Sequence, residues 1–234
     1  MSSIKNIKGW LLPNWDNHFE NALIQYSDGW EYQKKQRDFA LSYVKGKDIA
    51  IDIGANIGFW SKDLCKKFSN VWAFEPHKEN ILCFKKNLKD FKNWRLEEIA
   101  LSNENKNDAI LFSSPKECGN ISLSVNGVTH ATTNQTLNFS DLNTSKVNVK
   151  KLDNYIDIFD GKNIDFIKVD CQGHEKEIVQ GGLNILKKHN CVVVLELPLR
   201  NEEEIIYHNE LVKIMHSVGY IRRGNLKKET VFTK

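Results

Sequence analysis

The chain has 234 residues, of which 41% are hydrophobic and 27% charged, and its formal net charge is +3. This composition is ordinary for a soluble globular protein, and the length suits one α/β domain better than two small ones. The lysines are scattered over expected helix faces, so the mildly basic charge does not indicate a nucleic-acid-binding patch.

The spacing of the cysteines and the hydropathy of the chain indicate its cellular compartment. The five cysteines form no C-x-x-C pair and no His-Cys metal spacing, which is typical of reduced thiols in the cytosol. The first residues contain no apolar stretch of the signal-peptide type, and no uncharged run is long enough to cross a bilayer. We therefore expect a soluble, cytoplasmic protein without a membrane partner.

Residues 1–47 form an N-terminal extension that is rich in aromatic side chains. The spacing over residues 31–44 predicts a helix, so we expect a helical extension. The aromatic side chains are expected mainly to pack this helix across the edge of a sheet. In the alternative interpretation, Tyr32, Gln33 or Arg37 closes over a ligand bound at that edge.

The stretch 48–58 organises the rest of the chain. An apolar strand containing Asp52 leads into a turn with Gly54 and Gly58, and then into a helix. One face of that helix is apolar: Ile57, Trp60, Leu64 and Phe68. Glycines let a backbone approach a ligand closely, and a helix N-terminus offers unpaired N–H groups. Because Asn56 interrupts the G-x-G-x-x-G pattern, a dinucleotide or phosphate ligand is not indicated.

A second acid, Glu75, closes the next apolar strand and is followed by Pro76. In Rossmann-like sheets a carboxylate about twenty residues after the glycine turn binds ribose hydroxyls. Asp52 and Glu75 together therefore favour a nucleotide-sized ligand over a purely structural turn.

A third strand and its exit loop are predicted over residues 95–102, which makes Ala100 and Leu101 candidate ligand contacts. Residues 103–145 are rich in Ser, Thr and Asn, and the pair Asn126-Gly127 is typical of a hairpin. We expect a β-rich insertion here that covers the carboxyl edge of the sheet as a substrate lid. The alternative is a surface loop without that role.

The last third repeats the strand-acid-helix pattern. One strand ends in Asp170, the next ends in Glu196, and two extended segments finish the chain. We therefore predict a Rossmann-like α/β fold with a mostly parallel seven-stranded sheet, helices on both faces and a terminal antiparallel hairpin.

Several motifs together resemble the FkbM family of class I S-adenosylmethionine-dependent methyltransferases, from about residue 48 onward. They are Asp52-Ile53-Gly54-Ala55-Asn56-Ile57-Gly58, Ala73-Phe74-Glu75-Pro76, Ala100-Leu101-Ser102, Leu152-Asp153 and the run from Ile167 to Glu175. The resemblance implies a methyltransferase domain over 48–234 that converts S-adenosylmethionine to S-adenosylhomocysteine and methylates a hydroxyl of a small molecule or carbohydrate. The implied cofactor contacts are Asp52, Gly54, Ala55, Asn56, Gly58, Glu75, Pro76, Ala100, Leu101 and Asp170. Many family sequences carry Glu where Gln172 stands. This difference argues against a catalytic role for the Gln172 side chain.

The chemistry requires the acceptor oxygen, the methyl carbon and the sulfur to be held in line, and a nearby base to take the hydroxyl proton. Asp170 is the first candidate, His174 the second, and Glu196 shares the expected pocket. In the competing interpretations Asp170 caps the next helix, His174 is solvated and Lys168 forms a buried ion pair. Two carboxylates are too few to identify a metal site, so no metal is expected.

Other functions remain as alternatives. Base methylation is disfavoured because Asp170-Cys171-Gln172-Gly173 replaces the Asn/Asp-Pro-Pro-aromatic motif. An RNA ribose methyltransferase and a non-catalytic S-adenosylmethionine-binding domain stay open, although nucleic acid is not the expected partner. A nicotinamide oxidoreductase is disfavoured by Asn56. We expect the 103–145 insertion and the N-terminal helix to select the acceptor, and the sequence implies nothing about oligomeric state.

Overall fold

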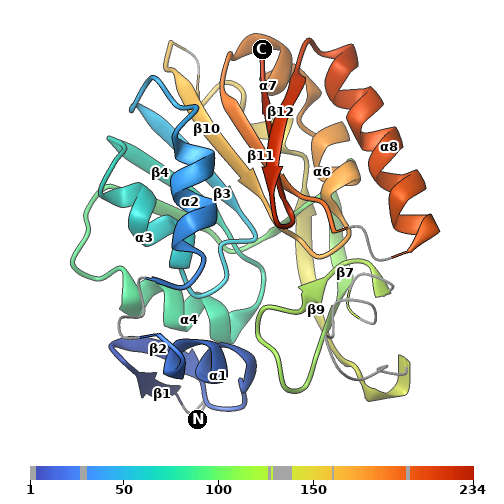
Figure 1. Cartoon of the computed structure of the whole chain (residues 1–234). Helices are drawn as coiled ribbons and strands as arrows, with labels where there is room; N and C mark the ends of the chain where they lie inside the picture. The colour runs from blue at the N-terminus through green and yellow to red at the C-terminus, as the bar shows by residue number, and fades with distance from the viewer. Residues whose placement is uncertain (1–3, 27–30, 126–127, 129–138, 160, 199–200) are drawn as a thin grey trace.

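A seven-stranded sheet forms the centre of the molecule (Figure 1). The structure is a computed structural model that describes residues 4–26, 31–125, 128, 139–159, 161–198 and 201–234. The sheet has the order β12-β13-β11-β10-β3-β4-β5, in which β13 runs antiparallel to both of its neighbours. Its strands are β3 (Ile49–Ile53), β4 (Asn70–Phe74), β5 (Trp94–Glu97), β10 (Ile164–Val169), β11 (Val192–Glu196), β12 (Ile221–Leu226) and β13 (Glu229–Thr233). The predicted sheet and its terminal hairpin are confirmed.

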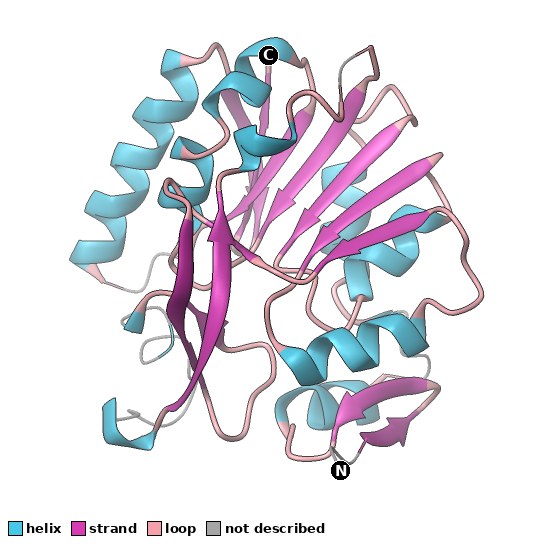
Figure 2. Ribbon diagram, turned by 180° about the vertical axis from the view of Figure 1, so that it is seen from behind, coloured by secondary structure: helices cyan, strands magenta, loops and turns pink. Residues whose placement is uncertain are grey.

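Helices cover both faces of this sheet (Figure 2). One core cluster joins the sheet to α2 (Lys34–Leu41), α3 (Phe59–Cys65) and α4 (Lys78–Asn87). The opposite cluster joins it to α6 (Glu175–Gln180), α7 (Leu183–Lys188) and α8 (Glu202–Ser217). Because side chains alternate along a strand, Ala50 packs into the first cluster and Ile51 into the second. Burial on both faces explains why β3 is apolar almost throughout.

The register of β3 against β10 sets the geometry of the candidate site. The two strands are parallel neighbours, and Lys168 lies opposite Asp52. Both strands end at the same edge, where the backbone N–H of Asp170 donates to the carbonyl of Ile53 at 3.1 Å. The residues that follow the two strands therefore meet at the carboxyl edge of the sheet.

A second, four-stranded sheet has the order β6-β9-β7-β8. Its strands are β6 (Ala100–Leu101), β7 (Lys106–Ser113), β8 (Ile121–Ser122) and β9 (Asn143–Lys150). The strand expected over 95–102 is thus divided, with β5 in the central sheet and β6 in the second one. The Asn126-Gly127 pair lies outside the described residues. Val125 and Val128 beside it are helical, so the prediction of a hairpin with extended residues on both sides of this pair is wrong.

The N-terminal extension is only partly helical, which corrects the expectation from sequence. It begins with a hairpin of β1 (Ile4–Ile7) and β2 (Trp10–Pro13), and α1 (His18–Ile24) follows. The two loop residues, Lys8 and Gly9, have φ values of 49° and 84°, as a tight hairpin turn requires. The Asn87 side chain on α4 fixes β2 by two hydrogen bonds to the backbone of Leu11. No helix in the described part of the chain is long and apolar enough to span a membrane.

Candidate active site

The carboxyl ends of β3, β4 and β10 surround a pocket, called the inner pocket below. It encloses about 520 Å³, its open mouth included. Most of the cofactor contacts that the sequence suggested line it: Gly54, Asn56, Glu75, Pro76, Ala100, Leu101 and Asp170. Ala55 instead lines the neighbouring polar pocket, whereas Asp52 and Gly58 lie behind the walls of both.

Gly54 allows the turn after β3 to touch the end of β10. Its φ is +73°, and a Cβ atom there would lie 2.0 Å from the carbonyl oxygen of Asp170. Any side chain would therefore push the two strand ends apart. Gly58, with φ +98°, forms the N-cap of α3, and a Cβ there would meet Leu88 at 2.4 Å. This second glycine serves the packing of the turn rather than the lining of the pocket.

Glu75 is fixed inside the inner pocket by backbone donors. The N–H groups of Asn56 and His77 donate to its two carboxylate oxygens at 2.8 and 2.9 Å. The residue is 4% exposed, and burial raises the pKa of its carboxyl group to about 7 despite these hydrogen bonds. Each carboxylate oxygen can accept a further hydrogen bond, so a ligand hydroxyl can still be bound.

The other wall of the inner pocket is apolar. It is lined by Ile53, Phe74, Pro76, Ile99, Leu101, Leu111, Ile121 and Leu123. These side chains come from the central sheet, from the second sheet and from the loops between them. The second sheet therefore supplies part of the wall, and an apolar slot next to a carboxylate suits a flat ring attached to a sugar.

A loop before β8 closes one side of the inner pocket. The carbonyl of Cys118 accepts hydrogen bonds from the side-chain amides of Asn56 and Asn80, at 2.9 and 3.0 Å. The N–H of Cys118 donates to buried Asp16 at 2.8 Å. Asn80 is 1% exposed, and its side-chain oxygen lacks a hydrogen-bond partner within the described part of the chain. The turn after β3, helix α4 and the N-terminal extension thus hold the same loop.

His174 lies in the inner pocket and not in the polar one. Its Nε2 is 2.9 Å from the hydroxyl of Ser102, and its Nδ1 is 3.7 Å from Glu177. Burial lowers the pKa of the imidazole, which favours the neutral form. His174 therefore shares the inner pocket with Asp170, but it does not line the polar pocket that contains Lys168 and Glu196.

A polar pocket opens beside the inner one and shares Gly54, Asn56, Gly119, Asp170 and Gln172 with it. Its volume is about 790 Å³, open solvent included. Charged and amide side chains line it, together with aromatic rings: His18, Phe19, Tyr32, Gln33, Phe59, Trp60, Glu117, Asn120, Lys168, Glu196 and Lys228. Tyr32 and Gln33, which were the alternative ligand contacts of the extension, are therefore in the site. Arg37 is instead buried against Asp63, at 3.5 Å.

Gln172 connects the two carboxylates of the polar pocket. Its side-chain amide donates to Asp170 at 3.0 Å and to Glu196 at 2.9 Å. Burial and the charge of Asp170 raise the pKa of Glu196 well above its usual value. The pKa of Asp170 is lowered despite burial, because Lys168 favours its ionised form. The pair thus prefers one proton on Glu196 and a negative charge on Asp170.

Lys168 is 5% exposed and is surrounded by oxygen atoms. Its ammonium lies 3.3 Å from Asp52 and 3.6 Å from Asp170, and it donates to the carbonyl of Gly54 at 3.1 Å. Burial alone would lower the pKa of this lysine, but the two carboxylates raise it. The interpretation of Lys168 as a buried ion pair agrees with this geometry. Asp52, which also accepts from Ser61 at 2.6 Å, supports the site from behind.

Glu175 stabilises the loop that carries Gln172. One of its carboxylate oxygens accepts from the N–H groups of Cys171 and Gly173, at 2.9 and 3.2 Å. The other oxygen is buried and has no hydrogen-bond partner among the residues that the structure describes. Burial raises the pKa of this carboxyl group to about 7, even though the two N–H groups lower it.

The sequence analysis did not identify Asn80 and Lys228 as site residues. The sequence pattern at Asn80 indicates a site only weakly, because Asn80 is a polar residue beside the apolar stripe of an amphipathic helix. No sequence pattern indicates Lys228, because it belongs to the turn between β12 and β13. In the structure it lies 3.4 Å from Glu196. In the described part of the chain, no three His, Cys, Asp or Glu side chains are grouped as metal ligands.

Comparison with known proteins gives a family and a fold. A family model described as "Methyltransferase FkbM domain" matches residues 52–222. The crystal structure of methyltransferase FkbM from Methylobacillus flagellatus KT has a TM-score of 0.51 and 15% identity, with 82% of this chain and 45% of that chain covered. This chain therefore spans less than half the length of that protein. Curated protein sequences gave no match.

Two further solved structures resemble the chain at lower scores. Magnesium protoporphyrin IX methyltransferase from Synechocystis PCC 6803, solved with bound SAM, has a TM-score of 0.46 and 8% identity, covering 92% of this chain and 82% of that one. Ribosomal protein L11 methylase from Lactobacillus delbrueckii subsp. bulgaricus has a TM-score of 0.44 and 8% identity, covering 87% and 78%.

The family match extends over well more than half of the chain and includes the glycine turn, Asp170 and Glu196. The polar-pocket residues of the N-terminal extension and Lys228 lie outside the matched range. The match confirms the resemblance found in the sequence and supports S-adenosylmethionine as the cofactor. The chain belongs to the FkbM family of methyltransferases.

Proposed function

We propose that this protein is an S-adenosylmethionine-dependent O-methyltransferase that acts on a hydroxyl group of a small molecule or a sugar. The observation that carries the proposal is the continuity of the two pockets. The inner pocket suits a nucleoside, and it opens at Asp170 into a polar pocket that contains Glu196 and Lys228. A hydroxyl compound bound there would lie next to the cofactor and to a carboxylate.

The inner pocket fits S-adenosylmethionine on features of this structure. Glu75 would bind the ribose hydroxyls, and the apolar slot between Pro76 and Leu101 would hold the adenine ring. The side-chain oxygen of Asn80, which is buried in this wall without a partner, would accept a hydrogen bond from the nucleoside. The turn with Gly54 would lie along the methionine part.

When bound, the cofactor supplies the methyl group and the sulfur leaving group. The chain must then orient the acceptor oxygen in line with them and remove its proton. Asp170 is ionised beside Lys168 and lies at the junction of the pockets, so it accepts the hydroxyl proton as the new bond forms. Gln172 keeps Asp170 and Glu196 in fixed positions, and Glu196 retains its own proton.

The lining of the polar pocket supports a small hydroxylated acceptor. Aromatic rings from Phe19, Tyr32 and Phe59 contact one another at centroid distances of 4.9–5.3 Å and form one wall. Amides, carboxylates and ammonium groups form the other. Sugars present apolar C–H faces and hydroxyl edges, and a wall of each kind is complementary to them.

Calorimetric titration with S-adenosylmethionine and S-adenosylhomocysteine tests the cofactor site first, and transfer of labelled methyl groups to hydroxylated sugars and other small molecules tests the reaction. We expect cofactor binding that is lost in Glu75→Ala, followed by incorporation of label into a hydroxyl compound. Binding without transfer to any acceptor would favour the non-catalytic alternative. Transfer to RNA in place of small molecules would favour ribose methylation.

A further inference from the structure

Lysines from two distant segments surround the entrance of the polar pocket. Lys34 and Lys35 begin α2, and Lys227 and Lys228 form the turn between β12 and β13. All four line one opening, called the outer opening below, which shares Tyr32, Gln33, Glu196 and Lys228 with the polar pocket. The four lysines therefore lie next to the polar pocket that contains Asp170.

Two of these lysines have no counter-charge. Lys34 is paired with Asp38, and Lys228 lies 3.4 Å from Glu196. Lys35 and Lys227 are exposed, and neither forms a hydrogen bond or ion pair with another described residue. Unpaired lysines are normal when they are scattered over a surface, but these two meet at the entrance of a site from opposite ends of the chain.

The same opening contains neutral donors. Gln36 lines it, is only 7% exposed and has no hydrogen-bond partner among the described residues. Its amide atoms are accessible from the opening, so the amide can donate to a ligand bound there. The first turn of α2 contains no acidic residue, and its backbone N–H groups are not used within the helix.

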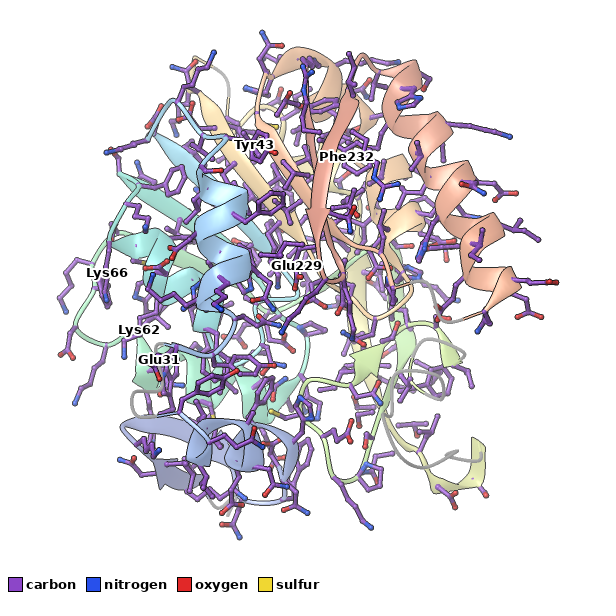
Figure 3. All side chains as sticks on the ribbon, viewed as in Figure 1. Glu31, Tyr43, Lys62, Lys66, Glu229 and Phe232 are labelled. Carbon is purple, nitrogen blue, oxygen red and sulfur yellow. The ribbon has the colours of Figure 1, made fainter. Side chains whose placement is uncertain are left out.

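The acidic residues of the outer opening offset the positive charge of its lysines only partly. They are Glu31, Glu196 and Glu229. Figure 3 shows Glu31 before α2 and Glu229 on β13, on the same face of the molecule. Glu229 is 6% exposed, and burial raises the pKa of its carboxyl group to about 7; burial and the charge of Asp170 also raise the pKa of Glu196. Near neutral pH the lysines therefore outweigh the carboxylates.

We propose that the outer opening binds a phosphate group of the methyl acceptor, with Lys35, Lys227 and the Gln36 amide as its ligands. This inference rests on the proposed function and narrows its substrate class to phosphate-bearing hydroxyl compounds. Ammonium groups and amide donors are the usual ligands of phosphate in proteins. The phosphate anchors one end of the acceptor while a hydroxyl further along reaches Asp170.

The subsite is tested first with inorganic pyrophosphate, titrated into the protein saturated with S-adenosylhomocysteine. We expect binding to the wild type at low salt that weakens with added NaCl, and at least about tenfold weaker binding to Lys35→Gln/Lys227→Gln. The control Lys89→Gln/Lys213→Gln changes the charge equally at two exposed lysines that lie outside the opening, and it should bind like the wild type. No binding to the wild type, or equal loss in both double variants, would refute the subsite.

Methyl transfer then separates this inference from the proposed function. We compare glucose with glucose 6-phosphate, and galactose with UDP-galactose, so that a terminal phosphate and a nucleotide diphosphate are distinguished. Faster methylation of a phosphate-bearing member, lost in Lys35→Gln/Lys227→Gln, supports the proposal. Preference for the neutral members refutes it and leaves the methyltransferase intact. Lysine-dependent pyrophosphate binding without transfer to any compound supports the subsite and refutes the O-methyltransferase.

Discussion

The side-chain amide of Gln172 donates a hydrogen bond to Glu196 at 2.9 Å, across the gap between the ends of β10 and β11. The same amide nitrogen also donates to Asp170. A Glu at this position would place three carboxyl groups together. In this chain the amide keeps the carboxyl groups of Asp170 and Glu196 close without adding charge.

Replacing Gln172 with Glu should displace the pH dependence of methyl transfer. A third carboxylate disfavours ionisation of Asp170, so we expect the acidic limb of the activity profile to move about one unit toward higher pH, while the rate at neutral pH, where Asp170 stays ionised, changes little. Gln172→Met removes the hydrogen bonds without adding charge, so its profile should move less. Equal profiles for the two variants would contradict the electrostatic explanation.

Asp170→Asn should abolish proton transfer while leaving the cofactor site intact. We expect the methyl-transfer rate to fall by about 10²–10⁴, with the affinity for S-adenosylhomocysteine changed less than about threefold. Glu196→Gln should lose much less, because Glu196 already carries its proton. A larger loss for Glu196→Gln than for Asp170→Asn would reverse the roles of the two carboxyl groups.

Glu75→Gln should weaken cofactor binding. The amide has one acceptor oxygen in place of two, so one of the N–H groups of Asn56 and His77 loses its partner and the ribose loses a charged acceptor. The expected loss is about 10- to 100-fold in affinity for S-adenosylhomocysteine, measured by calorimetry. Glu98→Gln, which removes an exposed carboxylate paired with Lys85, is the matched control and should bind normally. Normal binding by Glu75→Gln would remove Glu75 from the ribose site.

Buried Glu175 should make the protein less stable as the pH rises. Its pKa is raised from 4.5 to about 7 in the folded protein, so between these values the folded state binds more protons than the unfolded state. The free energy of unfolding then decreases with rising pH across this window, by about 3 kcal/mol at most for this group. Denaturant unfolding should show Glu175→Gln gaining stability over the wild type from pH 4.5 to 7 and no further above it. A pH-independent difference, as expected for the exposed control Glu98→Gln, would refute this assignment.

The sequence predicted the sheet better than the site. Strands buried on both faces, such as β3 and β11, are apolar except for Asp52 and Glu196, and acids at or after the strand ends identified the carboxyl edge. Local patterns also placed Glu75 and Asp170 correctly at that edge. The hairpin of β1 and β2 was missed because its four-residue strands are too short to show a period.

The sequence could not predict which candidate residues lie close to Asp170 in the folded sheet. His174 follows Asp170 by four positions, yet its ring turns to Ser102 in the inner pocket. Glu196 and Lys228 approach Asp170 only because β11 lies beside β10, and β13 beside β11, in the folded sheet. The two lysines of the outer opening belong to segments that meet only in three dimensions, so no local pattern could have joined them.

The pairing of Lys168 with Asp52 has a consequence for how the sheet assembles. The two residues face each other on neighbouring parallel strands whose other side chains are mostly interchangeable aliphatic groups. A shift of β10 by two residues would keep its apolar face buried but leave an ammonium and a carboxylate unpaired in the core, which costs several kcal/mol on the order of a broken buried pair. The contact that orders the charges of the active site therefore also specifies the alignment of the two central strands during folding.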